Sequence, residues 1–274
     1  MPATDPAVPA PSATDAAPPA GVHRSRRRLR AALRGGGRLV GTFLKLPGPD
    51  VVALAAQAGL DFVVVDLEHS ALDERTAADQ LRFAAALGLP ALVRVPAVDP
   101  GQVNRLLEAG AVGVQLSTVR SRAEAGALRA ASLYAPHGRR SISLAHPAAG
   151  YGVGGLDRYL AAEAADPPLL VAQIETATTD DPLRDLLAGL DVGFVGTTDL
   201  AVSLGLASTD DPTPLLRRTG DIADAARATG AALGGWVSDR TPDALARYGL
   251  TAAGYLVVGS DLQLLGAGLR RLAG

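Results

Sequence analysis

The chain has 274 residues, of which 48% are hydrophobic and 20% are charged, and its formal net charge is −2. This composition is typical of a globular protein and lacks the basic surplus of a nucleic-acid binder, so we expect small molecules or further copies of the chain as partners. There is no cysteine, which excludes disulfides and thiolate chemistry but does not fix the compartment. No apolar run approaches the roughly 18 residues of a membrane span, so we expect no membrane partner. We expect a cytoplasmic protein.

The first 30 residues are predicted to form a tail outside the fold. Residues 1–21 are rich in proline and alanine, and residues 23–34 concentrate arginine. The proline- and alanine-rich segment has too few large apolar side chains to bury enough surface to order itself. We therefore predict a disordered tail over residues 1–30, whose arginine-rich part leads into a short helix below the domain, and one catalytic domain over residues 31–274.

Eight short apolar runs follow, separated by alanine- and leucine-rich segments with a helical pattern. Continuous apolar runs of about four to eight residues are typical of parallel strands buried on both faces. Their alternation with helices predicts an α/β fold, a (β/α)8 TIM barrel, with an open doubly wound sheet as the alternative. No Gly-rich phosphate loop follows the first run, which disfavours that alternative. The predicted strands are residues 39–44, 61–66, 91–95, 112–116, 169–175, 192–197, 232–237 and 254–259.

The longest interval between strands follows residue 116 and contains one helical pattern and then many turn residues. Long insertions in such barrels usually serve the site. We therefore predict that residues 136–155 form a loop over the barrel mouth.

Polar side chains are concentrated where the predicted strands end, and in such barrels this end carries the chemistry. Taken singly, none of these residues is strong evidence, but a closed barrel would bring residues from several strands together. They are Lys45, Asp66, Glu68, His69, Arg94, Ser117, Thr118, Gln173, Glu175, Thr198, Asp199, Trp236, Ser260 and Asp261.

Several of these residues have two interpretations. His69 is the only one of the four histidines that follows a buried strand, which favours a functional role over a structural one. Arg94 interrupts an apolar strand where an unpaired guanidinium would be costly, so it must meet an anion, either a substrate or a neighbouring carboxylate. Ser70 is predicted to cap the following helix, since Ser70 to Asp73 form a Ser-x-x-acid pattern. Glu68 could contact a metal-bound water or only stiffen its loop.

Glu175 and Asp199 each end a predicted strand. Two hard oxygen ligands, completed by water and substrate, would suit Mg²⁺ or Mn²⁺. The alternative is an ion pair with Arg94.

Five segments occur in an order that resembles the HpcH/HpaI aldolase family of metal-dependent pyruvate aldolases, related to 4-hydroxy-2-oxoheptanedioate aldolase. The resemblance covers residues 38–270 and depends on the combination of D-x-E-H, V-R-V-P, Q-I-E-T and G-x-x-D-L. The segments are GTFLKLPGPDVVALAAQAGLDFVVVDLEHSALD, LVRVPAVDPGQVNRLLEAGAVGVQL, VAQIET, GFVGTTDLAVSLGL and YLVVGSDLQLL.

This resemblance implies a class II aldolase that reversibly cleaves a 4-hydroxy-2-oxo acid to pyruvate and an aldehyde. It implies that Glu175 and Asp199 bind Mg²⁺, Mn²⁺ or Co²⁺, with Gln173 near the ion. It also implies a homo-oligomer, commonly a hexamer.

The resemblance also assigns the other site residues. His69 corresponds to the histidine linked to proton transfer, with Asp66 placed to orient it, and Arg94 to the arginine that steadies the enolate oxygen. The turn from Gly196 to Asp199, including Thr198, resembles the segment whose backbone N–H groups hold the pyruvate carboxylate. These roles agree with the chemistry, because C3–C4 cleavage beside a 2-oxo group leaves electrons in an enolate and requires a base for the C4 hydroxyl.

The sequence departs from the family pattern in QLSTV and GTTDL, where proline is common, and in RRSIS of the predicted mouth loop. Because of these departures, the sequence does not identify the aldehyde that the pocket accepts. Three alternatives also remain open: Schiff-base chemistry at Lys45, the sole lysine; an acyl-CoA ester lyase of related architecture; and a non-catalytic barrel that binds 2-oxo acids.

Overall fold

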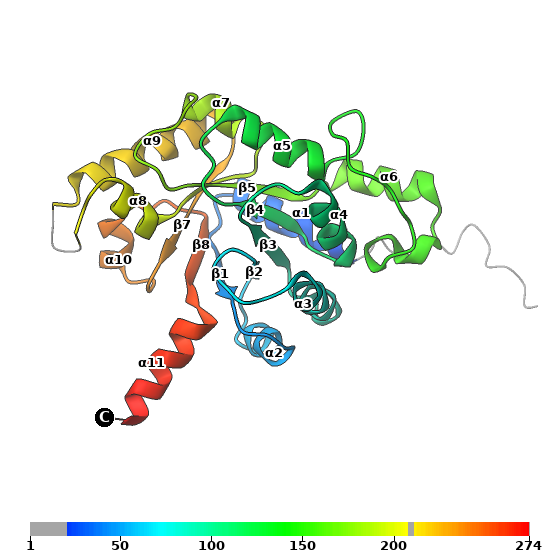
Figure 1. The fold of residues 1–274 in the computed structure, drawn as a ribbon, viewed down its shortest axis with the longest axis horizontal. Helices are drawn as coiled ribbons and strands as arrows, with labels where there is room; N and C mark the ends of the chain where they lie inside the picture. Colours follow the sequence, from blue (N-terminus) through cyan, green and yellow to red (C-terminus); the bar gives the residue numbers. More distant parts are fainter. Residues whose placement is uncertain (1–20, 208–210, 274) are drawn as a thin grey trace, which may run out of the picture.

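The protein is described by a computed structural model over residues 21–207 and 211–273. Its eight strands form a closed barrel in chain order, every neighbouring pair is parallel, and helices cover the outside (Figure 1). The predicted (β/α)8 barrel is therefore confirmed. The strands are β1 (Leu39–Leu44), β2 (Phe62–Asp66), β3 (Ala91–Val95), β4 (Gly113–Leu116), β5 (Leu169–Ile174), β6 (Val192–Val195), β7 (Ala232–Val237) and β8 (Tyr255–Ser260).

Twelve helical segments are found within the described residues. Among those residues, no helix has both the length and the apolar character needed to cross a membrane. The segments are α1 (Gly21–Arg34), α2 (Asp50–Gln57), α3 (Glu74–Leu87), α4 (Pro100–Ala109), α5 (Arg122–Ser132), the 3₁₀ helix η1 (Pro147–Gly152), α6 (Leu156–Ala165), α7 (Leu183–Leu187), α8 (Thr197–Ser203), α9 (Thr213–Thr229), α10 (Pro242–Arg247) and α11 (Asp261–Ala273).

Strand alternation divides the core in two. In β2, Val63 and Val65 pack outward against the helices, whereas Phe62 and Val64 face the barrel interior. At the amino ends of β2 and β8, inside the barrel, the Phe62 ring stacks on the Tyr255 ring with their centroids 4.3 Å apart. Both faces of each strand are thus apolar over most of its length, which explains the continuous apolar runs in the sequence.

The interior becomes polar towards the carboxyl ends of β2, β3 and β4. The register places Asp66 of β2 beside Arg94 of β3, and Arg94 beside Gln115 of β4. All three are buried. Because alternate residues of a strand point inward, the same pattern that builds the apolar interior delivers a row of polar side chains at its open end.

Helix α1 covers the opposite end of the barrel, so the fold begins earlier than the predicted boundary at residue 30. The Arg26 guanidinium donates to the backbone oxygens of Ala111 and Asp166, just before β4 and β5. It also donates to the Glu163 carboxylate at 2.7 Å. Residues 21–30 therefore belong to the folded part, while residues 1–20 of the predicted tail lie outside the described residues.

Glu163 of α6 is the centre of a buried ionic cluster. It accepts hydrogen bonds from Arg26, from His23 at 2.8 Å and from Arg140 at 3.2 Å. Burial raises the pKa of Glu163, but the Arg26 charge, the His23 hydrogen bond and the Arg140 charge outweigh it and lower the pKa to about 2. The cluster holds α1, α6 and the segment after α5 together.

The segment 136–155 was predicted to cover the barrel mouth, and this prediction is wrong. Arg140 in this segment pairs with Glu163 and donates to Asn104 of α4 at 2.8 Å. The segment therefore runs along the outside of the barrel, towards α6 on the right of Figure 1. The paired guanidinium accounts for this course, because a buried arginine must remain beside its carboxylate.

Ser70 does not cap a helix either. Helix α3 begins at Glu74, and its N-cap is Asp73, whose side chain accepts the Thr76 N–H at 2.7 Å. The Ser70 hydroxyl instead donates to the backbone oxygen of Asp66. Ser70 thus tightens the turn that follows β2.

Candidate active site

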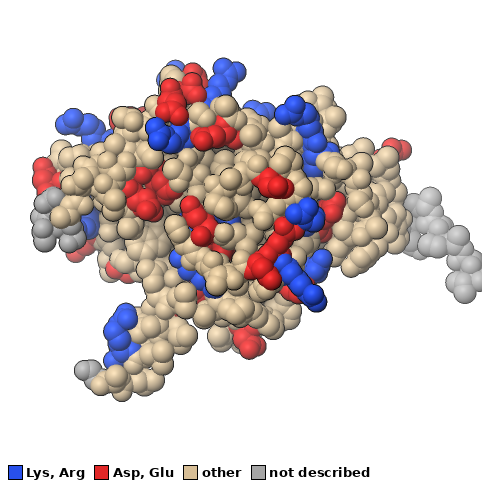
Figure 2. Space-filling model, viewed as in Figure 1, with Lys and Arg blue, Asp and Glu red and all other residues tan. Residues whose placement is uncertain are grey.

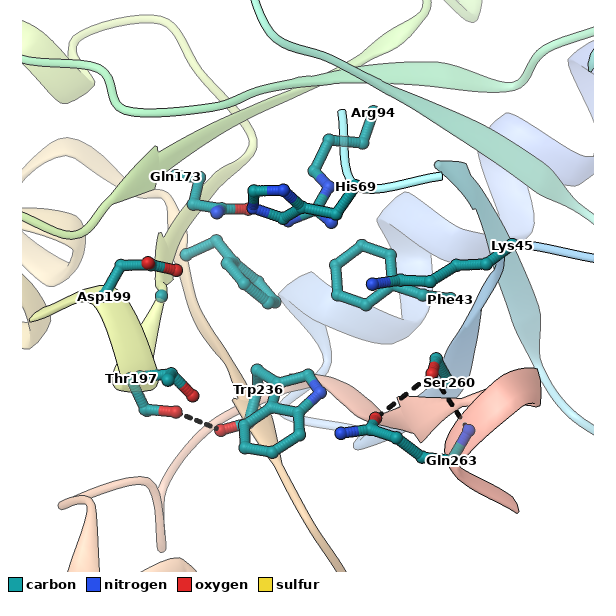
Figure 3. Close-up of a pocket in the computed structure, with 13 residues that line it drawn as sticks. Phe43, Lys45, His69, Arg94, Gln173, Thr197, Asp199, Trp236, Ser260 and Gln263 are labelled. Carbon is teal, nitrogen blue, oxygen red and sulfur yellow. Dashed lines mark hydrogen bonds between the residues drawn. The ribbon is translucent and has the colours of Figure 1, made fainter. Parts of the chain in front are cut away.

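A cavity of about 290 Å³ lies at the carboxyl end of the barrel (Figure 3). Six predicted site residues line it directly, whereas Asp66 and Glu175 are buried behind its surface. The lining residues are Phe43, Lys45, His69, Arg94, Gln173, Phe194, Gly196, Thr197, Thr198, Asp199, Trp236, Ser260 and Gln263.

The anion that Arg94 meets is a neighbouring carboxylate. Its Nε and Nη2 donate to the two oxygens of Asp66, at 2.8 and 2.5 Å, and its Nη1 lies 3.2 Å from Oε2 of Glu68. The guanidinium also lies 4.1 Å from the centre of the Phe43 ring. Arg94 is thus rigidly held by Asp66 and Glu68, and not by Glu175 or Asp199, yet it still lines the cavity.

Asp66 was predicted to orient His69, and the structure gives it a different main partner. Burial raises the pKa of Asp66, but the hydrogen bonds and charge of Arg94, with the backbone N–H groups of Glu68 and His69, bring it below its ordinary value. Asp66 therefore remains ionised. It holds the backbone of His69 at 3.2 Å, while its side chain serves Arg94.

The carboxylate next to the His69 ring is Glu68, whose Oε2 lies 3.7 Å from the His69 Nε2. Glu68 is itself fixed by Arg94 and by a hydrogen bond from the Ser117 hydroxyl. The His69 side chain remains 54% exposed, so it can reach a ligand in the cavity. Glu68, which the sequence left unassigned, is therefore the residue placed to steady His69.

Glu175 follows β5 and is buried, with both oxygens hydrogen-bonded. Its Oε1 accepts from the backbone and hydroxyl of Thr118, at 3.0 and 2.5 Å, and its Oε2 accepts from Nε2 of Gln173 at 2.5 Å. Burial raises the pKa of Glu175, the hydrogen bonds from Thr118 and Gln173 oppose this rise, and the charges of Asp199 and Glu68 add to it. The net effect is a raised pKa.

Gly196 is required for this position of Glu175. A Cβ at residue 196 would collide with Oε2 of Glu175 and lie 2.8 Å from its Cβ. The family resemblance implied that backbone N–H groups of the turn from Gly196 to Asp199 hold the substrate carboxylate. The Gly196 N–H instead donates to the backbone oxygen of Ile174 at 3.2 Å. Gly196 thus admits the carboxylate of Glu175 to the start of α8.

Gln115 was not among the residues predicted from the sequence. Its Nε2 donates to Oε1 of Gln173 at 2.6 Å, and Gln173 then donates to Glu175. This relay fixes which end of the Gln173 amide faces Glu175, because its oxygen is already used by Gln115. The signal in the sequence was the glutamine at an inward position of VGVQL, equivalent to Arg94 in ALVRV.

Thr118 is a second residue whose role was missed. Its φ of 48° lies in the left-handed region, which is costly for a β-branched residue. In this conformation both its N–H and its hydroxyl point at Glu175. The strained turn is thus explained by the two hydrogen bonds that it gives to one buried carboxylate.

The pair of Glu175 and Asp199 fits a divalent cation. Neither forms an ion pair with a lysine or arginine in residues 21–207 and 211–273, and Asp199 has no hydrogen-bond partner there. Carboxylate oxygens suit Mg²⁺ or Mn²⁺, and a bound cation would favour the charged form of Glu175, whose pKa is raised mainly by burial and to a lesser extent by the charge of Asp199. No set of three or more acidic or histidine ligands occurs in the described part of the chain, so substrate and water would complete the coordination.

The sequence of the chain is similar to those of known aldolases. The family model described as HpcH/HpaI aldolase/citrate lyase matches residues 39–265. A hydroxypyruvate/pyruvate aldolase of Rhizorhabdus wittichii is 34% identical over 182 residues, which cover 66% of this chain and 70% of the relative. A pyruvate aldolase of Rhizobium etli is 31% identical over 254 residues, 92% of this chain and 96% of that one.

A solved structure supports the same relationship. The HpcH/HpaI aldolase from Desulfitobacterium hafniense has a TM-score of 0.81 and 27% identity, with coverage of 89% of this chain and 95% of that one. The match to the family model spans all eight strands of the barrel.

Proposed function

This chain belongs to the HpcH/HpaI aldolase/citrate lyase family, and from that premise we propose that it is a divalent-metal-dependent aldolase. The reaction is the reversible cleavage of a 4-hydroxy-2-oxo acid to pyruvate and an aldehyde. The observation that best supports it is the proximity, at the open end of the barrel, of the buried Glu175, whose pKa is raised, to Asp199, whose carboxylate has no partner among the described residues.

Glu175 and Asp199 would hold the cation, which can be Mg²⁺, Mn²⁺ or Co²⁺. When bound, such an ion draws electron density towards the 2-oxo group of the substrate. Gln173, Thr118 and Gln115 keep the Glu175 carboxylate in place. This part of the site therefore binds the pyruvate end of the substrate, with the backbone of Thr198 beside it for the carboxylate.

Arg94 and His69 supply the remaining chemistry. Asp66 and Glu68 fix the Arg94 guanidinium, which keeps N–H donors free for the oxygen that becomes negatively charged in cleavage. His69 accepts the proton of the C4 hydroxyl, and Glu68 at 3.7 Å stabilises the ring once it carries that proton. Asp66 acts through Arg94.

The test is exchange of the pyruvate methyl protons with deuterium, followed by NMR, together with product formation from a panel of aldehydes. Exhaustive chelation should abolish both reactions, and Mn²⁺ or Mg²⁺ should restore them. Glu175→Ala should lose both even with metal added, while His69→Ala should lower aldol cleavage by about 10²- to 10⁴-fold. Full activity after complete metal removal would overturn the proposal.

We also propose that the active form is a homo-oligomer assembled through α11. This helix projects away from the barrel (Figure 1), has no buried residue, and is mostly uncharged before its terminal arginines (Figure 2). Such an apolar helix is rarely left in water. Its exposed leucines are Leu262, Leu264, Leu265, Leu269 and Leu272.

Light scattering measures the assembly directly. The unmodified chain should have the mass of an oligomer, a hexamer by family resemblance, and Leu265→Glu with Leu269→Glu should lower that mass. A monomeric mass for the unmodified chain at micromolar concentration would refute this part of the proposal.

A further inference from the structure

A second cavity, of about 480 Å³, lies on the outside of the barrel between α5 and α7, and we call it the α5–α7 groove. The two helices pack side by side near the top of Figure 1. None of the residues that line this groove lines the cavity at the carboxyl end of the barrel. Its volume is in the range of pockets that hold small molecules, and the proposed function gives it no role.

The groove is lined by two arginines that lack a carboxylate partner. Arg122 and Arg129 are two helical turns apart on α5, so they lie on the same face of the helix. Neither guanidinium forms an ion pair within residues 21–207 and 211–273. The Arg129 side chain donates once in that range, to the backbone oxygen of Ala188 at 3.3 Å. Most of the N–H donors of both groups are therefore free for a ligand.

The backbone after α7 holds Arg129 in place. A Cβ at Gly189 would collide with Nη1 of Arg129 and lie 2.9 Å from its Cζ, so the absent side chain makes room for the guanidinium. The hydrogen bond to Ala188 then keeps it against this backbone. A cation that is positioned before the ligand arrives lowers the entropy cost of binding.

The spacing between the two walls of the groove is also fixed. The Asp181 carboxylate, just before α7, accepts the backbone N–H of Arg122 at 2.8 Å. The Asp180 N–H donates to the backbone oxygen of Arg120 at 2.8 Å. These bonds join the segment that enters α5 to the segment that enters α7, so the groove exists without a ligand.

The other lining residues leave room and add one acceptor. Gly126 lies between the two arginines on α5, and a Cβ there would meet no atom within 4 Å. Asp185 is the one carboxylate among the described lining residues, and His137 is a third group that can carry positive charge. The groove therefore has an excess of positive charge beside a single acceptor for hydroxyl groups.

We propose that the α5–α7 groove binds a small hydroxylated phosphate ester of the sugar phosphate class. A phosphate monoester carries about −1.5 to −2 charges at pH 7, which balances two guanidinium groups. The planar fork of arginine donates in pairs to phosphate oxygens, and Asp185 can accept a hydroxyl group of the ligand. A carboxylate carries a single charge and would leave one of the two arginines without an anion.

The test is calorimetry of the unmodified chain with glucose 6-phosphate, glucuronate and glucose. These ligands share one ring and carry a phosphate, a carboxylate or a hydroxyl at the sixth carbon. Near physiological ionic strength, where non-specific attraction is screened, glucose 6-phosphate should bind about 10- to 100-fold more tightly than glucuronate. Glucose should not bind measurably. Amide hydrogen exchange should slow in α5 and α7 when glucose 6-phosphate is bound.

Gly126→Leu is the most informative variant, because its side chain fills the groove while leucine favours the helix over glycine. It should abolish the binding of glucose 6-phosphate without lowering the Tm. The matched control is Gly220→Leu on α9, where a Cβ also meets no atom within 4 Å, and it should leave binding unchanged. Arg129→Met should weaken binding by about 10-fold or more, and Arg129→Lys should weaken it less.

Three results would overturn this inference: no binding of glucose 6-phosphate at millimolar concentration, equal affinity for glucuronate, or binding that survives Gly126→Leu. The last result would place the ligand elsewhere on the chain. None of these results bears on the proposed aldolase function, because the two cavities have no lining residue in common.

Discussion

Substitution of Gln115 by leucine should weaken binding at the proposed metal site, although Gln115 is not one of its proposed metal ligands. Gln115 is fully buried, and its amide donates at 2.6 Å to the oxygen of Gln173, which donates in turn to Glu175. Without this donor, the Gln173 amide can turn and present its oxygen to the carboxylate, where two acceptors repel. Loss of such an outer partner typically weakens metal binding by about 10- to 100-fold.

The effect on stability should be much smaller. An unsatisfied buried acceptor on Gln173 costs about 1 to 3 kcal/mol. However, the substitution also removes Oε1 of Gln115, which has no partner within the described residues. We therefore expect a net loss near 1 kcal/mol, equivalent to about 2 to 4 °C in Tm for a chain of this length.

Electron paramagnetic resonance of free Mn²⁺ during a titration gives the dissociation constant directly, and calorimetric unfolding gives the Tm. Gln57→Leu, on the exposed surface of α2, is the control and should alter neither. An unchanged Mn²⁺ affinity in Gln115→Leu would show that the relay does not position Glu175. A collapse of the Tm would show that Gln115 matters mainly for folding.

Three further predictions concern other parts of the chain. Glu163→Gln leaves two buried arginines without their carboxylate and should cost about 3 to 5 kcal/mol of unfolding free energy, measured by chemical denaturation. Because the pKa of Glu163 falls from 4.5 to about 2 on folding, its stabilisation is complete above pH 4.5 and lost as the pH falls towards 2, so this pH dependence should shrink in the variant; an identical acid profile would contradict the role of the cluster. Gly196→Ala should displace the adjacent carboxylate and weaken Mn²⁺ binding, whereas Gly126→Ala, with open space around it on α5, should not; equal affinities would show that the contact is easily relieved. Borohydride reduction with pyruvate should leave Lys45 unmodified in the mass spectrum, since in the proposed mechanism a metal ion at Glu175 and Asp199 takes the place of a Schiff base; a covalent adduct would favour the lysine mechanism.

The sequence was sufficient to predict the barrel strands because each one carries an apolar residue on both faces. It also placed His69, Arg94, Gln173 and Asp199 at one end, and the cavity there confirms that they lie together. The sequence alone could not show which of the side chains at this end of the barrel pair with one another. Asp66 follows a buried strand and precedes a histidine, yet its partner is Arg94 of the next strand, and only the register between β2 and β3 shows this.

The boundary of the fold was misplaced for a similar reason. Read alone, an arginine-rich segment looks solvated, because an unpaired guanidinium cannot be buried. Arg26 is nevertheless fully buried, since its partner Glu163 lies 137 residues later in the chain. The prediction of a mouth loop over residues 136–155 failed for a related reason, because the same carboxylate binds Arg140 and holds this segment on the outside of the barrel. Long-range ion pairs leave no local pattern in a sequence.

The position of α1 has a practical consequence. Its hydrogen bonds to the backbone of the barrel lie just before the amino ends of β4 and β5, so residue 21 enters the fold on the face away from the cavity. An affinity tag or a surface linkage placed upstream of this helix would leave the cavity facing the solution. A linkage at the carboxyl terminus would instead act on α11, which carries Gln263 and the exposed leucines. Immobilisation of the protein for repeated use should therefore be made through its amino-terminal end.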